Sequence, residues 1–220
     1  MSDPLALPAG LAPAGDFAPA KTAFRLPPVR AYSERKPLKA SRLDQAAAKV
    51  IGRVRVGFAG WAARRYARIA RNALARAEEI AALSEEALHL RIQAITAVLR
   101  ARKTFRDADI AEAFALIREM SGRVKGQRHY GVQMMGAAAM LHGRVAQMAT
   151  GEGKTLTATL AAGAAALAGL SVHVVTVNDY LAERDAEEMR PLYAALGLTV
   201  GVIKEKQEQP ERAQAYGCHI

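Results

Sequence analysis

Apolar residues recur along the first half of the chain at the spacing of amphipathic helices. Between residues 41 and 61 a period close to 3.6 is set by Leu43, Ala47, Val50, Val54, Phe58 and Trp61. Three glycines interrupt this stretch, so the pattern predicts a bend or break and a second helix from about Trp61 to residue 83. Ser84 predicts the N-cap of a helix running to about Ala101, and Asp109 predicts the cap of another ending near Gly122.

From Val145 onward the pattern changes to alternating strands and helices. Short apolar runs predict strands at residues 143–148, 172–177 and 198–203, and helices are expected at 155–168 and 180–196. This order predicts an α/β fold with a parallel sheet and right-handed crossovers. The final residues, AYGCHI, look like the start of another strand. We therefore expect a sheet that is incomplete at its C-terminal end, in a truncated chain.

Charge and proline content divide the N-terminal region. Residues 1–40 hold seven of the nine prolines, which predicts a disordered Pro/Ala-rich arm. The net charge is +10, and this balance favours nucleic acid or an anionic membrane as a partner. Nine basic residues and one acid lie between Arg42 and Arg76. These residues predict either basic amphipathic helices that lie on anionic lipid or a solvated face packed on the main domain.

Several classes of protein are disfavoured. The chain has no run of 18 or more apolar residues, so the sequence predicts no transmembrane helix. The first residues also lack the basic lead-in of a secretory signal. Cys218, the single cysteine, excludes an internal disulfide and fits a reducing cytoplasm; we interpret it as a core thiol. The five histidines show no metal-ligand spacing.

The stretch MATGEGKTLTATLAAG, residues 148–163, has the composition of a phosphate cradle. Its glycines let successive backbone N–H groups point toward phosphate oxygens, and the helix that follows adds its positive N-terminal end. Lys154 is predicted to reach the β and γ phosphates, and the Thr155 hydroxyl is predicted to ligate Mg²⁺. Met148 stands where the usual P-loop pattern has its first glycine, an absence shared by many helicase-type motors.

The residues around the cradle resemble the SecA family, the motor ATPases of bacterial protein export. The resemblance covers roughly Ala62 to Ile220; TVNDYLAERD is similar to the family's helicase motif Ia and RHYGVQMMGAAAMLHGRVAQM to its Q-motif region. It implies a helicase-like, RecA-type P-loop fold that uses ATP and Mg²⁺. By the same resemblance Gln133 would read adenine, because an amide offers one donor and one acceptor. The nucleotide-binding residues implied are Arg128, Gln133, Thr150, Gly151, Glu152, Gly153, Lys154 and Thr155.

The chain also departs from the family pattern. Gln147 and Ala149 replace an acid and an arginine that are common beside the P-loop in the family, and the second change is expected to weaken nucleotide affinity. Asp179 and Arg184, in motif Ia, are expected to support a loop rather than to contact a moving substrate. Phosphoryl transfer also needs a metal-holding acid and a charge-stabilising arginine, which the family carries further along. We therefore expect no catalytic residue within this chain, weak nucleotide binding and negligible hydrolysis.

Proline content and charge predict an arm at 1–40 and basic amphipathic helices at 41–83, and the resemblance makes 84–220 the first part of a nucleotide-binding motor domain, truncated at its end. It implies a motor that drives unfolded preproteins through a SecY-type channel. ATPase activity is expected of the complete protein. That protein is expected to be cytoplasmic and to associate peripherally with the inner face of the cytoplasmic membrane by binding anionic phospholipid. Two alternatives stay open: a fragment of a nucleic-acid helicase, which TVNDYLAERD disfavours, and a non-enzymatic remnant with a binding role.

Overall fold

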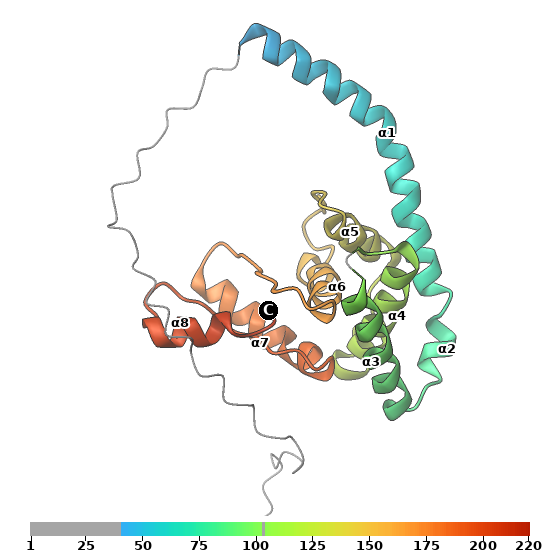
Figure 1. Cartoon of the computed structure of the whole chain (residues 1–220), viewed down its shortest axis with the longest axis vertical. Coiled ribbons are helices and arrows are strands. Elements are labelled where there is room, and N and C mark those ends of the chain that lie inside the picture. Colours follow the sequence, from blue (N-terminus) through green and yellow to red (C-terminus); the bar gives the residue numbers. More distant parts are fainter. Residues whose placement is uncertain (1–40, 103) are drawn as a thin grey trace, which may run out of the picture. The chain divides into compact units, whose positions relative to one another are not determined.

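The computed structural model describes residues 41–102 and 104–220, so the predicted arm at 1–40 lies outside the described residues (Figure 1). Residues 46–220 form one compact unit, and the unit formed by residues 1–45 contributes only the start of the first helix to the described part. In chain order the helices are α1 Arg42–Leu74, α2 Ala77–Ala81, α3 Glu85–Ala101, α4 Asp107–Lys125, α5 Gly131–Leu141, α6 Lys154–Leu167, α7 Asp179–Ala195 and α8 Gln209–Tyr216.

Helix α1 continues through the glycines at which the sequence predicted a break. A glycine inside a helix costs about 1 kcal/mol relative to alanine, which weakens a helix without ending it. A Cβ atom placed on Gly52 or Gly60 would meet no other atom within 4 Å, so no close packing against another element explains these glycines. The final turns of α1 enter the core through Ile69, Ala70 and Ala73.

Local capping sets the ends of the helices that the sequence predicted correctly. The Ser84 hydroxyl accepts a hydrogen bond from the Ala87 N–H at 3.2 Å, which fixes the start of α3. At the start of α7, Asn178 Oδ1 accepts from the Leu181 N–H at 2.9 Å. Gly126 adopts a left-handed conformation, φ 69°, so α4 ends at Lys125, a few residues beyond the predicted end near Gly122. Helix α4 also begins at Asp107, two residues before the predicted cap.

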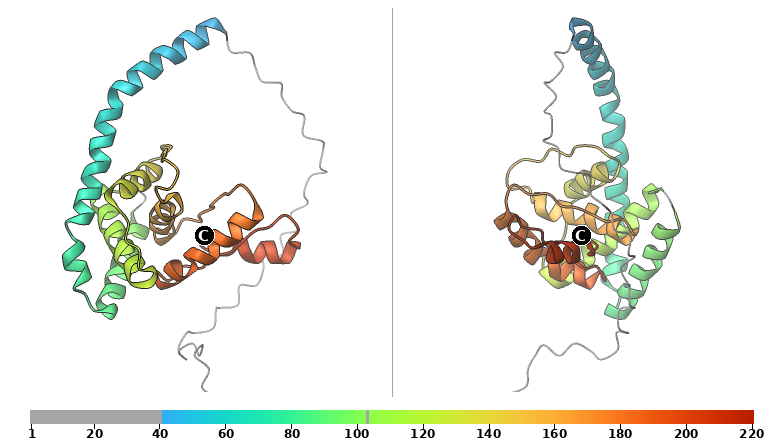
Figure 2. Two further views of the ribbon diagram at one scale, coloured as in Figure 1. Left: turned by 180° about the vertical axis from the view of Figure 1, so that it is seen from behind. Right: turned by 60° about the vertical axis from the view of Figure 1, so that its left-hand side comes forward.

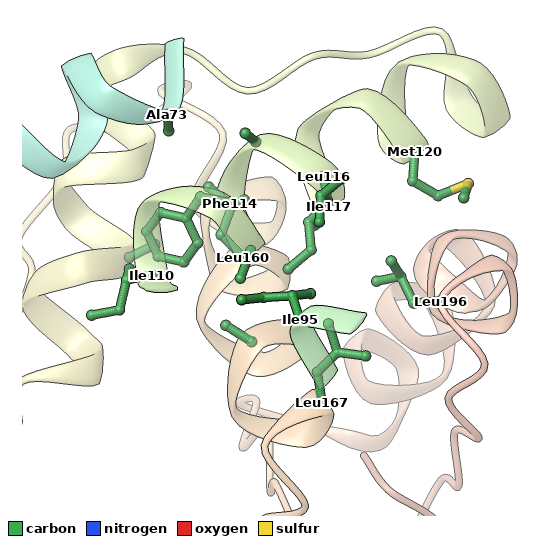
Figure 3. Close-up of a cluster of buried hydrophobic side chains, with 14 of the residues drawn as sticks. Ala73, Ile95, Ile110, Phe114, Leu116, Ile117, Met120, Leu160, Leu167 and Leu196 are labelled. Atoms are coloured by element: carbon green, nitrogen blue, oxygen red, sulfur yellow. The ribbon is translucent and has the colours of Figure 1, made fainter. Parts of the chain in front are cut away.

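The core lies where α3, α4 and α6 meet, and α4 contributes the largest share of its buried side chains. In Figure 3, Leu116 and Ile117 of α4 point toward Ile95 of α3 and toward Leu160 and Leu167 of α6. Phe114 is fully buried in the same cluster. Helix α6 is rich in alanine and contains Gly163, so its neighbours can approach closely. The Ile117 side chain would lie 3.2 Å from a Cβ atom on Gly163.

The predicted α/β fold with a parallel sheet is wrong for the residues that the structure describes. In neither view of Figure 2 is a strand drawn, and residues 143–148, 172–177 and 198–203 form no regular secondary structure. The last predicted strand, AYGCHI, begins instead inside α8.

The physical reason lies in the backbone pairing of these segments. A strand needs a continuous ladder of hydrogen bonds to a neighbour. Here a few bonds form without continuing into a ladder: Val172 N–H to the His219 carbonyl at 3.0 Å, Ile220 N–H to the Thr199 carbonyl at 3.2 Å and Gly201 N–H to the Ile220 carbonyl at 2.9 Å. Buried-strand patterns also require cover on both faces. Val145, Val175 and Val177 are instead 97%, 90% and 91% exposed.

No described helix has both the length and the apolar character that crossing a membrane requires.

Candidate phosphate-binding loop

The N-terminus of α6 is open to an anion. Gly153 is the N-cap residue, with φ 76°, and no side chain caps the helix. The first backbone N–H groups of any α-helix have no partner within the helix. Here no described side chain accepts from those of Lys154, Thr155 or Leu156. The helix therefore presents unpaired donors and a positive dipole end beside the lysine.

Residues 149–152 form a tight turn in front of this helix. The Glu152 N–H donates to the Ala149 carbonyl at 3.4 Å, and Gly151 lies between them with φ 86°. Positive φ at the third position is the requirement of a type II turn, which glycine meets without strain. Two charged side chains also reach Ala149: Glu152 Oε2 accepts from its N–H at 2.9 Å, and Lys154 Nζ donates to its carbonyl at 2.8 Å.

Gln133 links helix α5 to this loop. Its Oε1 accepts from the Tyr130 N–H at 2.9 Å, at the start of α5, and its Nε2 donates to the Glu152 carbonyl at 2.9 Å. The side chain is buried, and a Cβ atom on Gly153 would lie 2.6 Å from Nε2. Glycine at 153 is thus needed both for its positive φ and for this close approach. The structure brings together Gln133 and the loop residues that the sequence selected.

Arg128, the other predicted site residue outside the loop, is engaged with α4. Its guanidinium donates to both carboxylate oxygens of Glu119, at 3.1 Å each, and Arg123 donates to the same carboxylate at 3.0 Å. Gly122 makes room for the guanidinium, because a Cβ atom there would lie 2.6 Å from it. Burial raises the pKa of Glu119, but the hydrogen bonds from Arg128 and Arg123 outweigh it, so the pKa is lowered.

His129 fastens the same segment to the first turns of α6. The ring is fully buried, and its Nε2 lies 2.9 Å from the Leu156 carbonyl and 3.0 Å from the Thr159 hydroxyl. Because a carbonyl only accepts, Nε2 carries the proton. Nδ1 is buried without a hydrogen-bond partner among the described residues. No sequence signal marked this contact, which joins residues 27 positions apart.

Burial, with a smaller contribution from the nearby charge of Arg118, lowers the pKa of His129 to about 4, against the raising effect of the hydrogen bond to the Leu156 carbonyl. The folded pKa therefore lies below the unfolded value of about 6.5. Stability from the neutral ring is complete above pH 6.5 and is lost as pH falls toward 4. We expect the free energy of unfolding to fall by up to about 1.4 kcal/mol per pH unit in this range.

His129→Gln, which does not titrate, should flatten this slope in urea denaturation at pH 7, 6 and 5. The same substitution at His173, an exposed histidine, serves as the matched control and should keep the wild-type profile. An unchanged slope in His129→Gln would show that other groups cause the acid sensitivity.

A cavity of about 570 Å³ opens beside the loop. Lys154 and Thr155 line one side, and residues 172–179 and helix α7 line much of the rest. One carboxylate oxygen of Asp179 is engaged within the chain: its Oδ2 accepts a hydrogen bond from the Glu205 N–H at 2.9 Å. That contact agrees with the predicted role of Asp179 in supporting a loop. Arg184 pairs with its neighbour Asp185 at 2.6 Å.

Comparison with known proteins decides the family. Residues 59–220 match the sequence profile of the SecA DEAD-like domain. The chain belongs to the SecA family. A protein translocase subunit SecA from Alcanivorax borkumensis is 51% identical over 144 residues, covering 66% of this chain and 16% of the relative. The SecA of Afipia carboxidovorans is 52% identical over 142 residues, 64% of this chain and 15% of the relative.

A third member of the SecA family, the protein translocase subunit SecA 2 of Nitrosospira multiformis, is 40% identical over 189 residues. That match covers 86% of this chain and 28% of the relative. The chain thus spans less than a third of the length of each of these SecA relatives. The family resemblance that the cradle, motif Ia and the Q-motif region indicated is confirmed.

Proposed function

We propose that this chain is the ATP-binding part of a SecA-type motor that couples ATP hydrolysis to the export of unfolded preproteins. The observation that carries the proposal is the open N-terminus of α6, where unpaired N–H groups, Lys154 and a glycine-built turn converge. This combination of backbone donors, dipole and ammonium is suited to the phosphates of a nucleotide. In the proposed complex, residues 150–153 surround the phosphates and Lys154 neutralises their charge.

Gln133 is proposed to recognise the adenine base. Its side-chain amide is already fixed by the Tyr130 N–H and the Glu152 carbonyl. The amide oxygen can accept one further hydrogen bond, and the amide nitrogen can donate one more. Base recognition and the conformation of the phosphate loop would therefore share one side chain. Arg128 is proposed to line the same pocket from its place beside Glu119.

Thr155 is proposed to hold Mg²⁺. Its hydroxyl makes no hydrogen bond to any described residue, and the residue lines the cavity next to Lys154. A free hydroxyl oxygen at this position fits a hard cation that takes its remaining ligands from phosphate and water. When bound, the ion would neutralise phosphate charge. No cluster of three or more metal-binding side chains is found in residues 41–102 and 104–220. For these residues alone we propose nucleotide binding without efficient hydrolysis, because phosphoryl transfer also needs the acid and the arginine that the family carries further along.

The partners proposed follow from the family and from helix α1. The relatives are named protein translocase subunits, which supports a SecY-type channel and unfolded preproteins as partners of the complete motor. On α1, an anionic phospholipid surface would meet Trp61, which is 68% exposed, and the exposed residues Lys49, Arg53, Arg64 and Arg71. This contact would place the motor at the cytoplasmic face of the membrane.

Calorimetric titration of the chain with ADP and GDP tests the proposal. We expect ADP to bind more tightly, because the Gln133 amide matches the donor and acceptor edge of adenine. Gln133→Ala should weaken ADP binding about tenfold, since it removes a base contact and the support of the Glu152 carbonyl. Gln93→Ala, at an exposed position of α3, is the matched control. Failure of the wild-type chain to bind ADP would refute the proposed function.

A further inference from the structure

The two charged side chains of the phosphate loop both act on one peptide unit, that of Ala149. Glu152 Oε2 accepts from its N–H at 2.9 Å, while Lys154 Nζ donates to its carbonyl at 2.8 Å. The loop residues that hold these side chains are exposed. The carboxylate of Glu152 thus binds a backbone donor of the loop, and the ammonium of Lys154 binds a backbone acceptor.

Both contacts use the chemistry that a phosphate group would use. A carboxylate oxygen and a phosphate oxygen are each anionic acceptors for a backbone N–H, and an ammonium group binds either a carbonyl or a phosphate. The carboxylate of Glu152 therefore occupies a donor that a bound phosphate could take. It also brings a negative charge to the place where more negative charge would arrive.

The arrangement allows the carboxylate to leave without rebuilding the loop. Gln133 Nε2 holds the Glu152 carbonyl at 2.9 Å, so the backbone of that residue is fixed from the side of α5. The Glu152 side chain is exposed and makes its one hydrogen bond to Ala149. Rotation about side-chain bonds is enough to free the Ala149 N–H.

We propose that Glu152 is an internal competitor for the phosphate site and sets the affinity of the loop for anions. This inference rests on the proposed nucleotide-binding function. The carboxylate holds the loop in shape without ligand, and phosphate binding displaces it. The negative charge of Glu152 then opposes that of the ligand, so its removal strengthens binding.

Calorimetry with ADP, inorganic pyrophosphate and adenosine tests this assignment in wild type and Glu152→Gln. The substitution keeps the length and polarity of the side chain and removes its charge. One unit charge near 4 Å from the ligand in solvent corresponds to roughly fivefold in affinity. We expect about this gain for ADP and pyrophosphate, and no gain for adenosine. Glu86→Gln, the same charge change at an exposed position in the first turn of α3, should leave all three affinities unchanged.

The possible outcomes separate the two proposals. If neither wild type nor Glu152→Gln binds ADP or pyrophosphate, the proposed function fails, and this inference fails with it. If wild type binds both ligands and Glu152→Gln binds them with equal or lower affinity, the proposed function stands and the competing role of Glu152 is wrong. Equal gains for Glu152→Gln and Glu86→Gln would also overturn the inference, because they would show an effect of net charge alone. Thermal denaturation without ligand checks that each variant is folded.

Discussion

Replacement of Lys154 by alanine is expected to weaken binding of ADP to this chain by about 10- to 100-fold. A hydrogen bond to a charged partner contributes about 1.5–3 kcal/mol, and the ammonium would supply such bonds to the phosphates. Without ligand, Lys154 Nζ donates to the Ala149 carbonyl at 2.8 Å from an exposed side chain. Loss of this contact should affect the fold little. Isothermal titration calorimetry at fixed ionic strength measures the change.

A matched control distinguishes a phosphate contact from a change of net charge. Lys206 is exposed and precedes α8, so Lys206→Ala removes the same charge from another part of the surface. We expect its ADP affinity to stay within twofold of the wild type, as a screened surface charge requires. Equal weakening by the two substitutions would contradict a specific role for Lys154.

The largest expected effect on stability comes from Phe114 at the centre of the core. Its ring is fully buried, on the helix α4 that packs against both α3 and α6. Truncation of a buried phenylalanine costs about 3–5 kcal/mol, because the transfer energy is lost and a cavity is left. We expect Phe114→Ala to lower the urea midpoint strongly, with an unchanged dependence on urea concentration.

Leu90→Ala is the comparison for that measurement. Leu90 lies on α3 with 65% of its surface exposed, so its truncation should change the free energy of unfolding by less than about 0.5 kcal/mol. A small effect of Phe114→Ala, similar to that of Leu90→Ala, would show that the packing in Figure 3 does not carry the stability.

Helices were predictable from the sequence because their signals are local. The Ser84 cap and the glycine that follows α7 lie within a few residues of the ends they define. Strands depend on partners elsewhere in the chain, and the valine-rich run at 172–177 contains no information about whether a partner lies beside it. That difference explains why the helices at 85–101 and 179–195 were predicted closely while the sheet was wrong. The predicted break in the first helix was also wrong, because glycine weakens a helix without ending it.

The candidate site divides in the same way. The glycines, Lys154 and Thr155 are contiguous, so their common place at the start of α6 followed from the pattern. The contact of Gln133 with the Glu152 carbonyl spans 19 positions; family resemblance pointed to the residue and not to the bond. No local motif encodes how α4 and α6 pack. The paired hydrogen bonds from Arg128 to Glu119 and the buried position of the His129 ring depend on that packing.

The composition of α6 has a consequence for the entropy of the loop it carries. Its sequence, KTLTATLAAGAAAL, contains six alanines and one glycine, and much of the helix is buried. An alanine or glycine side chain has no rotamer freedom to lose on burial, whereas a long side chain loses up to about 2 kcal/mol. The helix that presents Lys154 and the free N–H groups can therefore be packed tightly with little loss of side-chain entropy. Thermal motion at the ligand end should then be confined to the turn at 149–152 and to the side chains of Glu152 and Lys154.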